Sequence, residues 1–348
     1  MGLVNSVNRL LAPMDVALTR RTTLDRTREQ LQLALTQQVD VAAQTHIDYS
    51  VLADALAPAI GALDELRRQH AALLNQQEEI RRQQSAQQRE VLRHQIASRW
   101  NVVDAVARHV VTPARRACPL CGHAGDSMRF GVLRSHCIFG GGVLTRHQCP
   151  ACDVIFGPDK MFDMTEHELT QEYEWHYKVY EEGDSTEAEI RAFHSLAPRR
   201  DGIYVNFGAG AWSKSVQQLR ADGWNVFAYE PHSSAAPSED WSLNSETQIA
   251  ALRVDGLFSN NVLEHLRHPA ADLRRMAGWL KPGALMAHAT PCYEYLYEYT
   301  RFHLYFFPGR SRELLADLAG LKIQSYEVDG HFMNCVFQPQ KANEGAMR

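Results

Sequence analysis

The sequence predicts an α/β fold in the C-terminal half of the chain, behind a small cysteine-rich β module and a long N-terminal helical segment. Three observations predict this. Apolar strand-like runs alternate with helix-like stretches from residue 202 onward, glycines follow the first of these runs, and two Cys-x-x-Cys pairs lie before them. The alternation favours parallel strands, because parallel strands are joined by crossover helices.

The charge balance of the chain limits the classes of binding partner that we expect. The 348 residues include 36 Lys and Arg against 41 Asp and Glu, a formal net charge of -5. We therefore expect no nucleic-acid partner, because binding to a phosphate backbone rests on clustered positive charge. The sequence contains no run of about 18 apolar residues, so we expect no membrane-spanning helix and a cytoplasmic protein.

Residues 1–22 form an N-terminal arm that mixes apolar residues with arginines. Val7 and Leu10, for example, interleave with Arg9 and Arg20. Such a stretch rests on an anionic membrane surface or faces a partner protein. Both interpretations stay open, so the expected location is cytoplasmic or peripheral to the inner face of the membrane.

Residues 23–112 are predicted to be helical, because Gln, Glu, Arg, Ala and Leu dominate their composition. After Pro58 a seam recurs at alternating spacings of three and four. It consists of Ala59, Leu63, Leu66, His70, Leu73, Gln77, Ile80, Gln84, Gln87 and Val91. This period of 3.5 predicts a coiled coil with a second helix, from this chain or from a copy. We therefore expect a homo-oligomer or an assembly partner here, with a solvated helix packed on its own domain as the alternative.

Residues 113–160 hold the two cysteine pairs and are predicted to form a zinc-binding β module. Each pair lies in a tight turn, so four thiolates are expected to meet in the tetrahedron that zinc prefers. The predicted ligands are Cys118, Cys121, Cys149 and Cys152. A closed site of four thiolates has no open position for water, so the expected role of Zn2+ is structural.

The interval between the two cysteine pairs contains 27 residues, which an inserted β-hairpin around residues 140–142 would explain. His123 and His147 are alternative ligands. Cys137 is expected to be a buried hairpin residue.

A helical connector, residues 161–200, leads into the C-terminal domain, residues 201–340. The domain opens with an apolar strand followed at once by Gly208 and Gly210, which let backbone approach a ligand at the carboxyl end of a parallel strand. About twenty residues later a second strand ends in Glu230, placed to accept hydrogen bonds from a ribose diol. The two signals together predict a cofactor site.

A third strand-like stretch, residues 254–259, runs into Asn260-Asn261 and then into Glu264-His265. A helix over 269–280, a Lys-Pro-Gly turn and a strand over 284–289 follow. The last segment, residues 341–348, is expected to be a disordered tail.

Residues 202–338 resemble the class I S-adenosylmethionine-dependent methyltransferases, in the subgroup with a Val-Leu-Glu-His-Leu segment after the fourth strand and a later Leu-Lys-Pro-Gly turn. The resemblance implies a seven-stranded, doubly wound, Rossmann-like sheet that binds S-adenosylmethionine. By position, Gly208 and Gly210 resemble the glycines beside the cofactor's methionine portion, and Glu230 the acidic residue on its ribose. Asn260 and Asn261 resemble the loop beside the sulfonium.

Three features depart from the pattern of this family. Asn206 stands where the family usually has an acidic residue, and Trp212 replaces the third glycine. Residues 232–252 show no clear adenine-contacting residue; Asp240, Leu243 and Asn244 are the candidates. A non-catalytic coiled-coil scaffold with a degenerate methyltransferase fold is therefore the alternative function from a different class.

The cysteine module also resembles one in bacterial methyltransferases that act on sugars and cell-surface glycans. Together the resemblances imply an O-methyltransferase for a hydroxyl of a sugar or glycan intermediate. Transfer to a hydroxyl needs a base, and His303 resembles a histidine of related enzymes near the acceptor. His265 and Glu264 rank second, as residues that orient the cofactor loop. The aromatic residues Tyr293, Tyr295, Tyr297 and Tyr299 form either a stacking wall for a sugar ring or, as aromatic runs do more often, part of a core or an interface.

Two other enzyme classes fit the sequence less well. A sugar C-methyltransferase is the nearer one, but the resemblance would then call for a Tyr and a Glu where Thr300, Arg301 and Phe302 precede His303. A nucleic-acid methyltransferase with a zinc ribbon is disfavoured by the acidic balance and by the lack of a basic stripe in the cysteine module.

Overall fold

A computed structural model describes residues 30, 33, 49–110, 113–140, 142–180, 183–210, 213–231 and 239–340. The predicted N-terminal arm, Trp212 and the predicted tail lie outside the described residues. The chain divides into two compact units, residues 1–85 and residues 86–348. Within the described residues, no helix is both long enough and apolar enough to cross a membrane.

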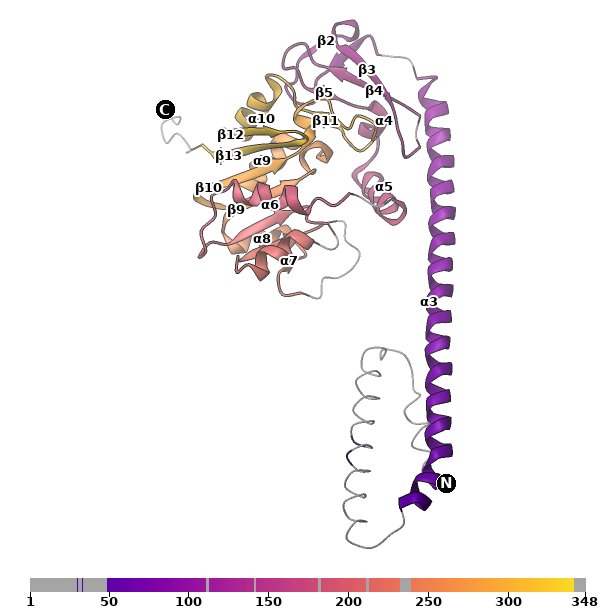
Figure 1. Cartoon of the computed structure of the whole chain (residues 1–348). Coiled ribbons are helices and arrows are strands. Elements are labelled where there is room, and N and C mark those ends of the chain that lie inside the picture. Colours follow the sequence, from indigo (N-terminus) through magenta and orange to yellow (C-terminus); the bar gives the residue numbers. More distant parts are fainter. Residues whose placement is uncertain are drawn as a thin grey trace. The chain divides into compact units, whose positions relative to one another are not determined.

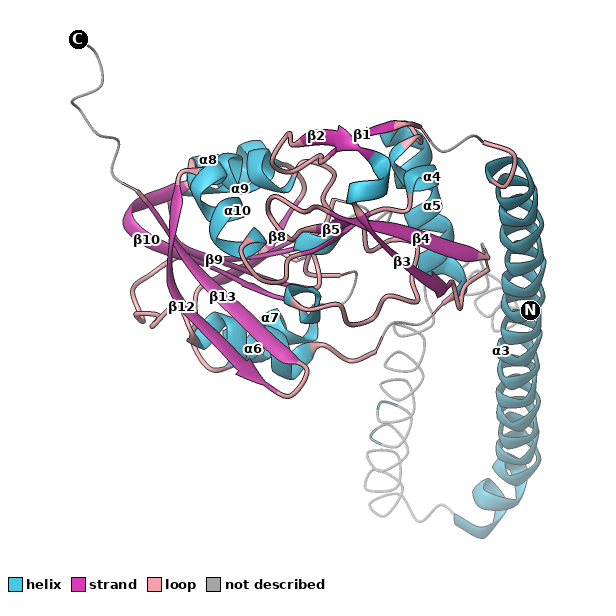
Figure 2. Ribbon diagram, turned by 90° about the horizontal axis from the view of Figure 1, so that it is seen from above, coloured by secondary structure: helices cyan, strands magenta, loops and turns pink. Residues whose placement is uncertain are grey.

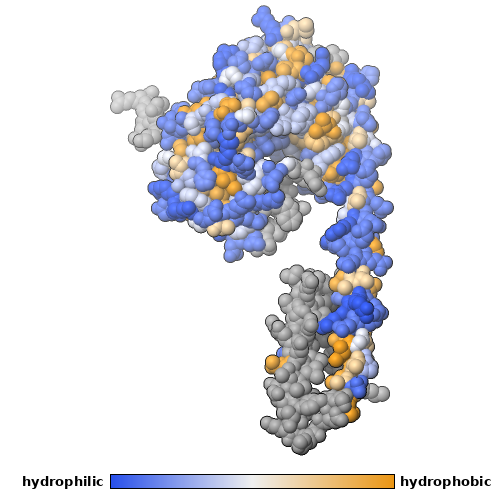
Figure 3. All heavy atoms as spheres, in the orientation of Figure 1, coloured by the Kyte–Doolittle hydropathy of each residue, from blue (hydrophilic) through white to orange (hydrophobic). Residues whose placement is uncertain are grey.

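The predicted long helix is present as α3, Tyr49–Ala107, which belongs in part to each unit (Figure 1). It begins before Pro58 and continues through it, although proline in a helix interior removes one backbone hydrogen bond. Apolar residues of the predicted seam are exposed in the first unit; Leu63, Leu66 and Leu73 keep 52%, 68% and 58% of their surface. Figure 3 shows mainly hydrophilic residues along the middle of the helix.

The end of α3 is packed into the second unit. Ile96 and Trp100 are fully buried, and the Trp100 indole N–H donates to Glu172 Oε2 at 2.8 Å. The guanidinium of Arg301 lies 4.6 Å from the Trp100 ring centroid, as a cation over an aromatic face. Burial of a tryptophan with its N–H satisfied fixes the last turns of α3 to this unit.

The predicted seven-stranded sheet is confirmed, in the order β12-β13-β10-β9-β6-β7-β8. The strands β8, β7, β6, β9 and β10 are parallel to one another, whereas β13 is antiparallel to β10 and to β12. Their bounds are β6 Tyr204–Phe207, β7 Val226–Tyr229, β8 Ser242–Leu243, β9 Val254–Asn260, β10 Leu280–Ala289, β12 Leu321–Asp329 and β13 Phe332–Pro339.

Helices cover both faces of this sheet (Figure 2). On one face lie α6 and α7, and on the other α8, α9 and α10. Their bounds are α6 Thr186–His194, α7 Lys214–Ala221, α8 Glu246–Leu252, α9 Pro269–Ala277 and α10 Ser311–Ala319. The central strand β6 is buried on both sides, and its residues are accordingly apolar or aromatic except for Asn206.

The cysteine-rich segment forms a two-stranded and a four-stranded sheet, followed by α4, Asp159–Phe162, and α5, Glu166–Val179. The expected hairpin around residues 140–142 joins β3 to β4. The four-stranded sheet has the order β11-β5-β4-β3, so one of its strands comes from far along the chain. The bounds are β1 Arg115–Ala117, β2 Ala124–Asp126, β3 Gly131–His136, β4 Val143–Gln148, β5 Ile155–Phe156 and β11 Tyr305–Phe306.

Candidate functional site

The glycine loop follows β6 and packs against the loop that follows β9. Gly208 and Gly210 have φ values of +74° and +68°, which side chains disfavour. A Cβ atom on Gly208 would lie 2.5 Å from Val262 Cγ2, so no larger residue fits there without displacing Val262. Glycine at 208 therefore permits both the turn and the close approach of the two loops.

Glu230 directly follows β7 and points back to the glycine loop. The backbone N–H of Gly210 donates to Glu230 Oε2 at 3.1 Å. Tyr229 O also accepts from the N–H groups of Gly208 and Ala209, at 2.8 and 3.1 Å. The predicted ribose acceptor and the predicted glycine loop are therefore adjacent.

Asn260 ends β9, and Asn261 adopts a left-handed conformation with φ +55°. The Asn261 N–H donates to Ala289 O at the end of β10, at 2.9 Å. The strands β7, β6 and β9 are neighbours, and the strand order reverses between β6 and β9. Ligands of doubly wound sheets bind outside the carboxyl ends at such a reversal, which is where these five predicted cofactor residues lie.

His303 lies between a carboxylate and a thiol. Its Nε2 is 3.9 Å from Glu264 Oε1, and its Nδ1 is 3.3 Å from Cys292 Sγ. The hydroxyl of Thr290 donates to Glu264 Oε1 at 2.8 Å and so orients the carboxylate. One ligand atom from each of Glu264, Cys292 and His303 lies within 4.8 Å of the others, so the group has the geometry for proton transfer and also for holding a cation.

The imidazole of His303 is held neutral. Burial lowers its pKa well below the usual value, and the nearby charges of His265 and Arg146 act in the same direction. The rings of His265 and His303 are 4.9 Å apart. His265 Nδ1 lies 3.0 Å from the Tyr173 hydroxyl and 3.1 Å from Phe302 O, so His265 is fixed to the same loop.

The four aromatic residues of the run divide between the core and half-buried positions. Tyr293 is fully buried against Tyr326, so it belongs to the core, which is the commoner of the two roles that the sequence left open. Tyr297 and Tyr299 are half-buried with ring centroids 5.6 Å apart. Tyr295 packs on Phe306 instead, with centroids 4.8 Å apart.

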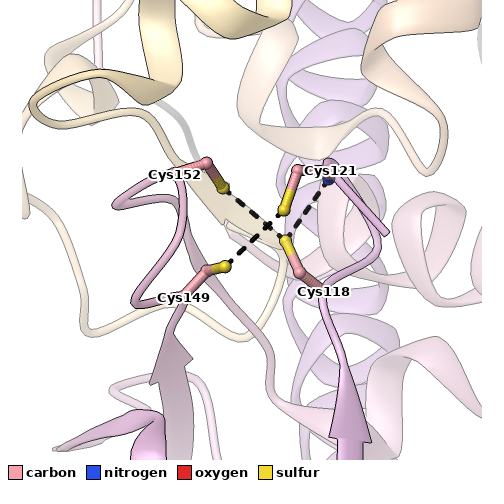
Figure 4. A group of neighbouring side chains, drawn as sticks. All are labelled: Cys118, Cys121, Cys149 and Cys152. Carbon is pink, nitrogen blue, oxygen red and sulfur yellow. Dashed lines mark hydrogen bonds between the residues drawn. The ribbon is translucent and has the colours of Figure 1, made fainter. Parts of the chain in front are cut away.

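The four predicted metal ligands come together (Figure 4). Cys118 Sγ and Cys152 Sγ are 3.8 Å apart, Cys121 Sγ and Cys149 Sγ are 3.7 Å apart, and all four sulfurs lie within 4.8 Å of one another. Four sulfurs each about 2.3 Å from one tetrahedral zinc ion would be about 3.8 Å apart. The sulfur spacing therefore fits the ion that the sequence predicts.

Each cysteine pair lies in the same kind of turn. The residue after the second cysteine is left-handed in both, Gly122 at φ +73° and Asp153 at φ +67°. The N–H groups of Cys121 and His123 point at Cys118 Sγ and Cys121 Sγ, at 3.5 and 3.4 Å, as donors that stabilise thiolates.

Thiols so close together do not ionise alike. A hydrogen bond from Cys152 lowers the pKa of Cys118 to about 5, whereas burial raises the pKa of Cys149 to about 11. A bound cation would hold all four as thiolates. Within the described residues this group contains the four cysteines alone, without His123, His147 or Cys137.

Arg146, which the sequence reasoning missed, joins the cysteine module to the loop that carries His303. Its side chain is fully buried and donates to the carbonyl oxygens of Glu298 at 2.7 Å, Thr300 at 2.6 Å and His303 at 3.2 Å. A signal was present in β4, where Arg146 follows the inward position of Leu144 by two residues. A cation at an apolar position of an alternating strand indicates a buried partner.

We expect Arg146→Met to destabilise the second unit and to release the loop over residues 298–303. Loss of the guanidinium leaves three buried carbonyl groups short of a donor, at a cost of about 3 kcal/mol or more. Urea unfolding and amide hydrogen exchange of the loop measure the two effects. Arg134→Met is the matched control, because Arg134 is exposed on the neighbouring strand β3. Equal effects of the two substitutions would contradict the role of Arg146.

Residues 184–340 match a family model described as a methyltransferase domain. The matched segment contains the glycine loop, Glu230, Asn260 and His303, but neither cysteine pair. No curated protein sequence matches the chain.

Several solved structures are similar in fold to part of the chain. One is the 1,6-didemethyltoxoflavin-N1-methyltransferase of Burkholderia thailandensis, with bound 1,6-didemethyltoxoflavin and S-adenosylhomocysteine. It is 13% identical, with a TM-score of 0.40, over 57% of this chain and 96% of that chain. Another is human N-acetylserotonin methyltransferase in complex with SAM, 13% identical, with a TM-score of 0.35, over 52% of this chain and 58% of that chain. The mitomycin 7-O-methyltransferase is 16% identical, with a TM-score of 0.37, over 51% of this chain and 61% of that chain.

Proposed function

We propose that the protein is an S-adenosylmethionine-dependent methyltransferase that methylates a hydroxyl of a sugar or glycan intermediate. One observation carries the cofactor part: the glycine loop, Glu230 and Asn260 meet at the carboxyl ends of β6, β7 and β9, inside the segment that matches a methyltransferase domain. This arrangement suits a ligand with a ribose and a charged amino-acid portion.

Each cofactor residue has a distinct role in the proposal. Gly208 and Gly210 lie beside the methionine portion, and glycine at 208 permits the close approach of the loop to Val262. Glu230 accepts hydrogen bonds from the ribose hydroxyls, and its contact with the Gly210 N–H keeps the carboxylate beside the loop. Asn260 and Asn261 lie beside the sulfonium of the cofactor.

His303 is the proposed base. S-adenosylmethionine supplies a methyl group by in-line displacement, and the acceptor hydroxyl loses its proton as the oxygen–carbon bond forms. His303 is neutral, so its imidazole is able to take that proton, although its lowered pKa makes it a weaker base than an exposed imidazole. The Glu264 carboxylate, 3.9 Å from Nε2, stabilises the imidazolium that results, and His265 positions the loop.

The sugar or glycan part rests on different grounds. It is supported by the resemblance of the cysteine module to that of glycan methyltransferases and by the half-buried pair Tyr297 and Tyr299 before His303. The net charge of -5 disfavours nucleic acid as the acceptor.

Calorimetric titration of the whole protein with S-adenosylmethionine tests the cofactor site. We expect micromolar binding that Glu230→Ala weakens at least tenfold, or about 1.4 kcal/mol, because the ribose loses its acceptor. Asp317→Ala, on the exposed side of α10, is the control and should bind as the wild type does. An absence of binding to the wild type would refute the enzyme proposal and favour the scaffold alternative.

The same preparation is then incubated with sugar and oligosaccharide acceptors, and methylated products are identified by mass spectrometry. His303→Gln should lower the rate of transfer while leaving cofactor affinity unchanged. Methylation at carbon would instead support the C-methyltransferase alternative.

We also propose that the four cysteines bind one structural Zn2+. The sulfur separations of 3.7 and 3.8 Å support this assignment, as do the two left-handed turn residues Gly122 and Asp153.

Elemental analysis should find one zinc ion per chain. We expect Cys149→Ser to lose this ion and to lower the melting temperature by at least about 6 °C, equivalent to about 2 kcal/mol in a unit of this size. The control is Cys137→Ser, a half-buried cysteine outside the cluster, which should keep its zinc. Full zinc content in Cys149→Ser would contradict the assignment.

A third proposal concerns α3, whose seam we assign to pairing with a second copy of the chain. The exposed seam residues Leu66, Leu73 and Ile80 support it by their heptad spacing. Intrahelical ion pairs such as Arg81 with Glu78 occupy the flanks, at 2.9 Å. Residues 1–22 are proposed to contact a membrane surface or an assembly partner.

Sedimentation analysis at micromolar concentration tests the pairing. The wild type should be dimeric or larger, and Leu66→Lys/Leu73→Lys should be monomeric, because like charges would face each other on the seam. Ala71→Lys/Ala72→Lys adds the same charge on another side of the helix and should not dissociate the assembly. A monomeric wild type would rule out pairing with a second copy.

A further inference from the structure

One buried carboxylate outside the predicted site connects three elements around the glycine loop. Glu189 of α6 keeps only 7% of its surface. Its Oε1 accepts from the Ser185 hydroxyl at 2.5 Å, and its Oε2 accepts from Asn206 Nδ2 at 2.6 Å. Oε2 also accepts from the hydroxyl of Ser215, at the start of α7.

These partners bracket the glycine loop. Asn206 is the last residue but one of β6, immediately before the loop, and Ser215 is the second residue of α7, immediately after it. The amide of Asn206 also donates to Ser215 Oγ at 3.3 Å. A single carboxylate on a helix outside the loop therefore ties the two ends of the loop together.

The three contacts of Glu189 are all with groups that donate, as a carboxylate requires. Burial raises the pKa of Glu189 above its usual value, and the hydrogen bonds from Ser185, Ser215 and Asn206 only partly offset this rise. The N-terminus of α7 also favours a negative charge, because backbone N–H groups point outward there. Asp184, the nearby like charge, is paired with Lys214 Nζ at 3.1 Å.

The identity of residue 206 gives this network a functional meaning. Asn206 occupies the position where the resembled family usually has an acidic residue, and it is fully buried. Its amide contacts the Glu189 carboxylate, so the negative charge beneath the loop is present but is carried by a different element.

We propose that Glu189 is a positioning residue for the cofactor loop, which supplies from α6 the carboxylate that residue 206 lacks. The inference rests on the proposed cofactor site, which it deepens. Asn206 is then no sign of degeneration, because its amide donates to the relocated carboxylate.

A double-substitution cycle between positions 189 and 206 tests the proposal. Glu189→Gln removes the charge, and Asn206→Asp alone puts a second carboxylate against Glu189. We expect each single substitution to weaken S-adenosylmethionine binding at least tenfold, because like charges in a buried site cannot both ionise without cost. The swap Glu189→Gln/Asn206→Asp, with one carboxylate and one amide again in contact, should bind within about threefold of the wild type. Glu187→Gln, an exposed change on the same helix, is the control.

Amide hydrogen exchange of the ligand-free protein gives a second readout that does not depend on the cofactor. The peptides around 206–210 and 213–215 should exchange faster in each single variant and return to the wild-type rate in the swap. Peptides of α10 should not change.

Additive effects of the two substitutions, in binding or in exchange, would overturn the proposal. If the wild type binds no S-adenosylmethionine, the proposed function fails, while rescue of exchange by the swap would still support the positioning role of Glu189. Unchanged exchange in both single variants would overturn that role.

Discussion

Burial of the Arg146 guanidinium is the constraint on which the arrangement of the candidate catalytic loop depends. A buried cation costs several kcal/mol unless its hydrogen bonds are satisfied. The oxygens that satisfy Arg146 are the carbonyl groups of Glu298, Thr300 and His303, with the hydroxyl of Ser135. The loop cannot move away without leaving this cation unpaired, so the Arg146 contacts hold its conformation.

A second arginine ties the same loop in the opposite direction. The Arg301 side chain extends from the loop and donates to Phe139 O at 3.2 Å and Gly140 O at 3.0 Å in the β3–β4 hairpin. It also lies 3.5 Å from Glu172, which accepts from Trp100. The last turns of α3, the cysteine module and the loop with His303 are therefore held by one buried polar network. Removing one member would leave the others partly unsatisfied, which is why such networks specify a single arrangement.

The sequence predicted what depends on local signals. The long helix, the alternation of strands and helices, the hairpin around residues 140–142 and the meeting of four cysteines all follow from periodicity, turn residues and spacing. Glu230 was predicted because a carboxylate at the end of a strand has a recognisable place in a doubly wound sheet. The topology of the seven-stranded sheet was predicted from the family resemblance and not from the alternation of strands and helices.

The missed residues are those whose partners lie far away in the chain. Arg146 and the carbonyl of Thr300 are 154 residues apart, and Trp100 and Glu172 are 72 apart. Glu189 was passed over because a glutamate in an amphipathic helix is normally solvated, and only the folded structure places it against Asn206. The role of Tyr293 stayed open in the sequence, since an aromatic run does not reveal which ring enters the core.

The cysteine module cannot be regarded as an independent domain of the second unit. Its four-stranded sheet is completed by β11, which pairs with β5 through Tyr305 and Phe306, next to His303. The turn of the second cysteine pair also contacts α10, because Asp153 accepts from the guanidinium of Arg310 at 2.9 and 3.0 Å. This exposed ion pair contributes little to stability by itself. Separating the cysteine module from the rest of the unit would instead break the pairing of β11 with β5 and leave the buried Arg146 without its partners. A stabilising effect at the four sulfurs must therefore extend to the loop of His303, since the strand that closes the cysteine module begins two residues beyond it.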